Sequence, residues 1–121
     1  MNIQEDYKSI KEYFSPKVLA EVNNSYVKIA KIKGNDLPWH VHQKEDEFFF
    51  IIEGKLLMEI QNQDSFLMKE GDYYVVKRGI KHRISSEKEC KIMLVEDKTT
   101  AHTGEVHSAI TKTIEDQLRK D

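Results

Sequence analysis

Short apolar runs separated by glycine or Asx turns fill the middle of this 121-residue chain. From residue 47 onward the runs cover residues 47–52, 55–61, 65–69, 73–77, 81–85 and 90–97. Two further runs, at 17–22 and 26–33, precede them and flank Asn23-Asn24-Ser25. Segments this short, at such regular spacing, are typical of antiparallel strands. The sequence therefore predicts an all-β fold, an antiparallel sandwich or barrel.

The two ends of the chain have a different pattern. Apolar residues from Ile3 to Phe14 recur at helix-like spacing among charges, and Ser15-Pro16 follows as a stop, which predicts an amphipathic helix over residues 3–14. Beyond Asp97 a polar linker precedes Ile110, Ile114 and Leu118, whose spacing of four predicts a C-terminal helical segment. His102 and His107 fall in this tail, and we interpret them as surface histidines. Within 26–33, Val27 and Ile29 on one face and Ala30 and Ile32 on the other predict a bent or bulged strand.

His40 and His42 are separated by one residue, so on an extended chain both imidazoles point the same way. Polar residues 43–46 are suited to a turn, after which Glu47 can begin the next strand facing the same side. If the segment carrying His82 pairs with this one in a small barrel, His82 completes a set of three histidines and one glutamate. The alternative is that these residues are solvated histidines and glutamates of ordinary strands.

Three imidazoles and one carboxylate are a donor set for a divalent transition metal: Fe2+, Mn2+, Ni2+, Co2+, Zn2+ or Cu2+. Since Cys90 is the single cysteine, the sequence argues against a structural zinc site or an iron–sulfur cluster, and the apolar neighbours of Cys90 predict a buried thiol. Four protein ligands would leave one or two positions open on a five- or six-coordinate ion. Substrate binding at the metal, with Lewis-acid chemistry, is therefore feasible but not required.

Two motifs give the chain its resemblance to a known family. Gly34, His40, His42, Glu47 and Gly54 have the spacing of the first motif of the cupins, and Gly71, Gly79 and His82 match the second. The second motif is imperfect, because Lys77 stands where proline is usual and Ser86 where asparagine is usual. Neither departure falls on a ligand. The chain thus resembles a small single-domain cupin over roughly its middle half.

The resemblance implies a cupin-type antiparallel β-barrel, or double-stranded jelly roll, with short helical segments at both ends. We expect a single domain over residues 1–121, with a core of about 17–97, an N-terminal helix of about 3–14 and a C-terminal tail of about 98–121. It also implies a metal held by His40, His42, Glu47 and His82, and a homodimer, which the apolar faces of the terminal segments favour as well.

Three functions remain open on this basis. The first is a metal-dependent enzyme on a small organic molecule, of the dioxygenase, isomerase, epimerase or lyase class. The second is a protein that binds or senses a small ligand without turnover, and the third is a structural dimeric barrel. Catalysis would need an acid–base group beside the metal, for which Tyr73 or Tyr74 are the candidates. Candidate lining residues at the mouth are Trp39, Phe49, Ile51, Met58, Tyr73 and Tyr74, several of which must belong to the core. We interpret Lys77 and Lys81 as solvated lysines near a turn, with attraction of an anionic substrate to the mouth as the alternative.

Charge and composition argue against other classes of function. The net charge of −2 gives no basic surface for nucleic acid and no polybasic patch for a membrane. The N-terminal residues lack the basic start and apolar core of a signal peptide, and no apolar run has the length of a membrane span. We therefore expect a cytoplasmic protein whose partner is a small molecule.

Overall fold

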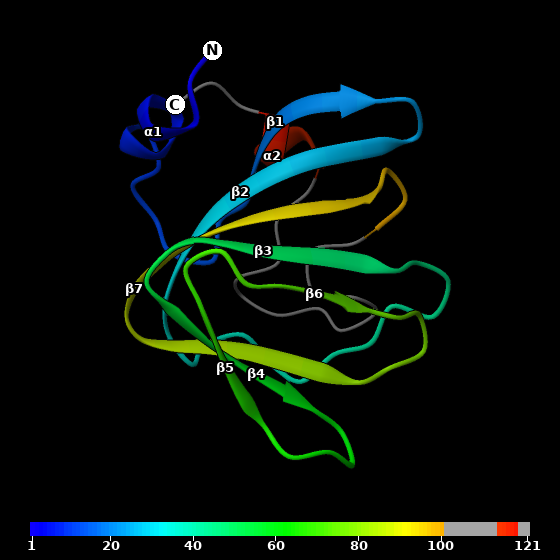
Figure 1. The fold of residues 1–121 in the computed structure, drawn as a ribbon. Coiled ribbons are helices and arrows are strands. Elements are labelled where there is room, and N and C mark those ends of the chain that lie inside the picture. Colours follow the sequence, from blue (N-terminus) through cyan, green and yellow to red (C-terminus); the bar gives the residue numbers. More distant parts are fainter. Residues whose placement is uncertain (101–113, 119–121) are drawn as a thin grey trace.

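The computed structural model describes residues 1–100 and 114–118, and its framework is an antiparallel β-barrel of the jelly-roll type (Figure 1). The elements of the chain, in order, are α1 (Ile3–Lys8), β1 (Lys17–Val22), β2 (Ser25–Gly34), β3 (Glu47–Glu53), β4 (Lys55–Ile60), β5 (Phe66–Lys69), β6 (Tyr73–Val76), β7 (His82–Asp97) and α2 (Ile114–Leu118). The larger sheet has the strand order β1-β2-β7-β3-β6, and β4 pairs with β7 and with β5 on the other side. The all-β prediction is confirmed.

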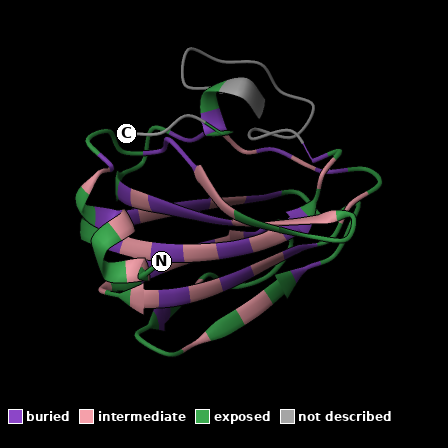
Figure 2. Cartoon of the chain, turned by 90° about the horizontal axis from the view of Figure 1, so that it is seen from above, coloured by how far each residue is buried: buried purple, intermediate pink, exposed green. Residues whose placement is uncertain are grey.

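Burial alternates along the strands, as Figure 2 shows in bands. Along β3 the buried positions are Glu47, Phe49 and Ile51, while the residues between them are partly exposed. The inward-facing apolar side chains of β2, β3, β4 and β7 form one core, in which Ile51, Leu56 and Met58 are fully buried. Cys90 belongs to this core, as its neighbours predicted, and burial raises the pKa of its thiol to about 12.

The N-terminal helix is shorter than predicted. Asn2 caps α1 by accepting hydrogen bonds from the backbone N–H groups of Gln4 and Glu5, but the helix ends at Lys8. Beyond it the chain turns, and Phe14 has a left-handed φ of 55°, which no continuing helix permits. Helical spacing correctly predicted that Tyr7 and Phe14 are buried. It did not predict that only Tyr7 lies in the helix, or that the two residues pack in different clusters.

Strand β2 is regular where a bend was expected. Its register with β7 is continuous from Ser25 to Ile32, and the irregularity comes only between Ile32 and Gly34. Both faces are apolar because both are covered: Ala30 and Ile32 face the core, while Ile29 packs under Tyr7 of α1. Apolar residues on both faces reflected two-sided burial, not a bulge.

Strand β7 is one long strand where the sequence predicted two. Its first residues pair with β4, and the stretch from Cys90 to Asp97 pairs with β2. The exposed residues 87–89 had the polarity of a loop, yet they continue the strand between the two sheets. Gly54 makes this approach feasible, because a Cβ there would lie 2.8 Å from the Glu89 carbonyl oxygen and its φ is +89°.

The C-terminal prediction is described only in part. Helix α2 lies against β1, within the segment expected to be helical (Figure 1). His102 and His107 lie outside the described residues. No helix among the residues described here combines the length and apolarity needed to cross a membrane.

Candidate metal centre

Two loops distant in sequence meet at one end of the barrel. His40 and His82 form an isolated antiparallel bridge, in which each backbone N–H donates to the carbonyl of the other at 3.0 and 2.9 Å. The Gly79 N–H donates to the His42 carbonyl at 2.8 Å, and the Arg78 N–H donates to Asp46 Oδ1 at 2.9 Å. His40 and His42 thus lie on an irregular segment clamped to the second motif, and not on the regular strand that was expected.

The four residues proposed as ligands converge. His40, His42, Glu47 and His82 are all buried, and their donor atoms lie within 4.8 Å of one another. Glu47 Oε1 is 3.3 Å from His82 Nε2 and 3.4 Å from His42 Nε2. A metal with ligand bonds of about 2.0–2.2 Å holds its ligand atoms up to about 4 Å apart. A small contraction around an ion would therefore bring all four into its coordination sphere.

Backbone carbonyls set the direction of two of the imidazoles. His40 Nδ1 is 2.9 Å from the Pro38 oxygen, and His82 Nδ1 is 3.0 Å from the Ile80 oxygen. Since a carbonyl only accepts, Nδ1 carries the proton in both rings and the lone pair lies on Nε2. This is the arrangement that orients histidines toward a metal.

His42 supplies an independent sign of a missing partner. Its Nδ1 and Nε2 are buried, and neither makes a hydrogen bond with the described residues, although Nε2 lies 3.4 Å from Glu47 Oε1. A buried polar atom without a partner is costly and needs an explanation. A bound cation at the centre of the four residues would accept the His42 lone pair, so the donor set fits a divalent metal.

Burial and mutual charge shift the protonation of the group. Burial, and then the nearby His82, lower the pKa of His40 to about 4. For Glu47, burial raises the pKa, but the interactions with His42 and His82 outweigh it and hold the pKa well below its usual range. A neutral His40 imidazole and an ionised Glu47 carboxylate are protonation states that metal binding requires.

A second carboxyl group, Glu96, lies directly opposite Glu47 in the ladder between β3 and β7. Glu96 is buried and hydrogen-bonded to Glu47, and its Oε1 lies 2.7 Å from Nζ of the buried Lys28. Burial, and then the charge of Glu47, raise the pKa of Glu96 well above its usual range. The pairing of Lys28 with Glu96 was not predicted from the sequence. The sequence does contain a sign of it, because two residues of opposite charge occupy inward positions of two apolar strands.

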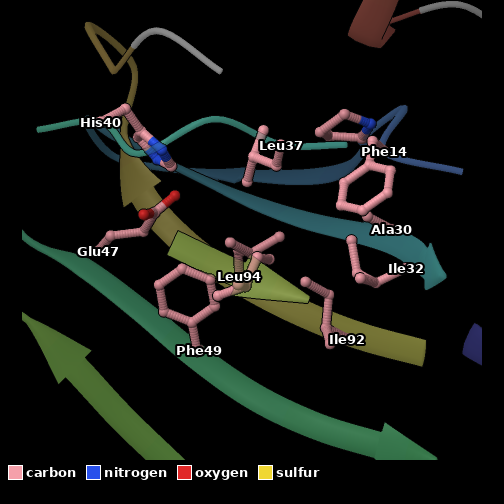
Figure 3. A pocket seen from close by; sticks show the side chains of 11 residues that line it. Phe14, Ala30, Ile32, Leu37, His40, Glu47, Phe49, Ile92 and Leu94 are labelled. Atoms are coloured by element: carbon pink, nitrogen blue, oxygen red, sulfur yellow. The ribbon is translucent and has the colours of Figure 1, made fainter. Parts of the chain in front are cut away.

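A cavity of about 30 Å³ adjoins the candidate metal site, and Figure 3 shows the His40 ring and the Glu47 carboxylate facing each other at one end of it. Apart from these two, every lining side chain is apolar. The lining consists of Phe14, Pro16, Ala30, Ile32, Leu37, His40, Glu47, Phe49, Ile84, Ile92 and Leu94. Of the expected lining residues only Phe49 is among them, and neither Lys77 nor Lys81 reaches it.

The two candidate tyrosines face opposite ways, as alternation required. Tyr73 is 68% exposed and stacks on Phe48 on the outer face of the sheet, away from Glu47. Tyr74 pairs in register with the inward-facing Phe49, is half-buried, and packs against Phe66. Tyr74 is therefore the one tyrosine of the pair that shares a face with the ligands.

Comparisons with known proteins give a consistent result. Residues 30–96 match the Cupin domain family. Over 89 residues the chain is 30% identical to the Bacillus subtilis (strain 168) protein YdbB, and this match covers 74% of this chain and 78% of YdbB. A solved cupin-2 domain protein from Shewanella frigidimarina has a TM-score of 0.77 and 32% identity, covering 81% of this chain and 94% of its own. The solved structure of the Neisseria meningitidis protein NMB1881 has a TM-score of 0.73 and 28% identity, and the match covers 81% of this chain and 98% of NMB1881.

Proposed function

Because the chain belongs to the cupin family, we propose that it binds one divalent transition metal through His40, His42, Glu47 and His82 and acts there on a small organic molecule. The observation that carries the proposal is the buried, unpartnered imidazole of His42 within a cluster of four donors. A metal bound there would supply Lewis-acid polarisation of a ligand oxygen or a water of lowered pKa. The chain's own residues would hold the ion in a largely apolar, water-poor setting.

The cavity lining points to the kind of molecule. A ligand would meet the metal ligands His40 and Glu47 at one end and apolar side chains such as Phe49 and Leu94 elsewhere. No lysine or arginine lines the cavity to neutralise a phosphate. A cavity of about 30 Å³ holds about two waters, so a larger ligand must displace some lining side chains. We propose a ligand with a metal-coordinating oxygen head and a small apolar body.

Turnover and binding without turnover remain the two candidate roles. A proton donor beside the metal would favour an enzyme of the dioxygenase, isomerase, epimerase or lyase class, and Tyr74 is our candidate because it lies on the inward face. The cavity lining favours the second role, since no polar side chain other than two metal ligands contributes to it. Product formation from a bound ligand by the metal-loaded protein, abolished in Tyr74→Phe, would establish the first role.

Metal analysis of protein purified without chelators tests the proposal. We expect close to one divalent ion per chain, and close to none in the His40→Ala/His42→Ala variant, because two remaining ligands hold a divalent ion weakly. The matched control His102→Ala/His107→Ala removes the same number of imidazoles and should keep its metal. Metal that persists in the first variant, or is lost in the control, would contradict the ligand assignment.

The ligand class is tested with the same proteins. Small apolar carboxylic acids and diketones should raise the melting temperature of the metal-loaded protein, because a ligand that binds only the folded state stabilises it. Sugar phosphates should not, and the His40→Ala/His42→Ala variant should respond to neither group. A melting temperature raised by sugar phosphates alone would refute the apolar ligand class.

We also propose a homodimer formed through the outer face of β3 and β6. Strand β6 is at the edge of the larger sheet, and it exposes Tyr73 at 68% and Val75 at 37% beside Phe48. A second copy of the chain would cover this apolar strip, so sedimentation at micromolar concentration should show a dimer and Val75→Lys should shift it to monomer. A monomeric unsubstituted protein would argue against the interface.

A further inference from the structure

A charged side chain lies in the interior of the barrel, away from solvent. Lys28 is 1% exposed, on the inward face of β2 between residues of the apolar core. Lysine is almost never buried unless it is paired, because an isolated buried ammonium is costly. Its Nζ lies 2.7 Å from Glu96 Oε1 and donates a hydrogen bond to Gln117 Oε1 of α2. Two separate elements, β7 and α2, therefore satisfy one buried cation.

The same Glu96 also reaches the candidate metal centre. Glu96 and Glu47 are register partners in the β3–β7 ladder, and their side chains are hydrogen-bonded to each other. Glu47 in turn contacts His42 and His82. Polar contacts thus run without interruption from Gln117 through Lys28 and Glu96 to Glu47.

We propose that Lys28 and Glu96 are positioning residues for the metal ligand Glu47, and that docking of α2 through Gln117 is coupled to metal binding. The inference rests on the proposed metal site. A carboxylate ligand held by an outer partner is already oriented for the ion, and loss of such partners weakens metal affinity. Coupling between two sites is reciprocal, so a bound metal must stabilise the docked α2 as much as docked α2 stabilises the metal.

Titration of the metal-free protein with Co2+, followed by its visible absorption, tests the positioning role. Glu96→Leu and Lys28→Met are expected to weaken Co2+ binding by about 10- to 100-fold. Glu96→Gln should stay within about threefold of the unsubstituted protein, because its amide still donates toward Glu47 and accepts from Lys28. The matched control Glu53→Leu removes a carboxylate from the same β3–β7 ladder, where it pairs with Lys91 at 3.2 Å, and should leave affinity unchanged.

The coupling to α2 has its own readout. Gln117 lies on α2, outside the strands of the barrel, and Gln117→Leu should weaken Co2+ binding by about 2- to 30-fold. Hydrogen–deuterium exchange in a peptide covering residues 114–118 should slow when Co2+ binds the unsubstituted protein, and not in Glu96→Leu at a Co2+ concentration that saturates both. The Gln117→Leu variant also keeps the inference testable if Lys28→Met fails to fold.

The outcomes separate this inference from the proposed function. If the unsubstituted protein binds no Co2+, the metal site itself is refuted. If it binds Co2+ and folded Glu96→Leu binds equally well, the site stands and the positioning role is overturned. Equal losses in Glu96→Leu and Glu96→Gln would overturn the role of the hydrogen bond to Glu47. Unchanged affinity in Gln117→Leu would overturn the coupling to α2.

Discussion

Acidifying the metal-free protein from pH 7 to pH 4 is expected to lower its free energy of unfolding by about 3 kcal/mol through His40 alone. Burial, with a contribution from His82, lowers the pKa of His40 from 6.5 to about 4 in the folded protein. Below pH 6.5 the unfolded chain binds a proton at this histidine that the folded protein rejects. Stability is therefore fully present above pH 6.5 and is lost as the pH falls toward 4.

The neighbouring carboxyl groups act in opposite directions over the same range. The pKa of Glu47 is held well below its usual value, so its contribution is also lost on acidification. The pKa of Glu96 is raised well above its usual value, so the folded protein keeps a proton at Glu96 that the unfolded chain releases at neutral pH. Acidification protonates the unfolded chain as well, and the contribution of Glu96 to the free energy of unfolding therefore rises as the pH falls. The contribution of Glu96 therefore opposes those of both Glu47 and His40, so the contribution of His40 is measured by comparison with a variant that lacks this histidine.

Urea unfolding in the presence of a chelator, at pH 7 and at pH 4, measures the effect. The His40→Gln variant is the control, because it keeps a polar side chain that does not titrate in this range. The loss of stability on acidification should be about 3 kcal/mol smaller in this variant. An equal loss in both proteins would show that His40 is not the buried neutral group of the metal-free site.

Local patterns were sufficient to predict most strands and the four candidate ligands. The apolar run at 47–52, glycine turns such as Gly54 and the His40/His42 spacing are signals carried by neighbouring residues, and the resemblance to the cupins built on them is confirmed. The convergence of His82 on the first motif needed only the premise of a small barrel. The structure brings the four residues together in that way.

Features that depend on contacts between residues distant in the chain could not be predicted from the sequence. The end of α1 at Lys8 follows from where the chain must turn to bring Phe14 into the core. The continuity of β7 through exposed residues 87–89 follows from its pairing with two sheets. The pairing of Lys28 with Glu96 required knowing that β2 and β7 are adjacent, with Lys28 and Glu96 on the same inward side. Each of these three features is determined by tertiary packing.

Replacing Phe49 by alanine is expected to destabilise the protein by about 3–5 kcal/mol. Phe49 is 2% exposed, lies in the main core, and meets the ring of His82 with its centroid at 6.2 Å. Truncation removes buried apolar area and leaves a void that the surrounding sheets refill only in part. Because Phe49 lines the cavity, the void would open directly beside the candidate metal centre.

The adjacent Phe50 offers a control on the same strand. Its side chain points to the outer face and is only half-buried, so Phe50→Ala should cost about 1–2 kcal/mol. Urea unfolding of both variants with chelator present compares an inward with an outward phenylalanine at the same place in the sheet. Equal costs would contradict the inward orientation of Phe49. If Phe49→Ala retains its metal, the larger cavity should admit apolar ligands bulkier than those that stabilise the unsubstituted protein, because the volume of the phenyl ring becomes available to them.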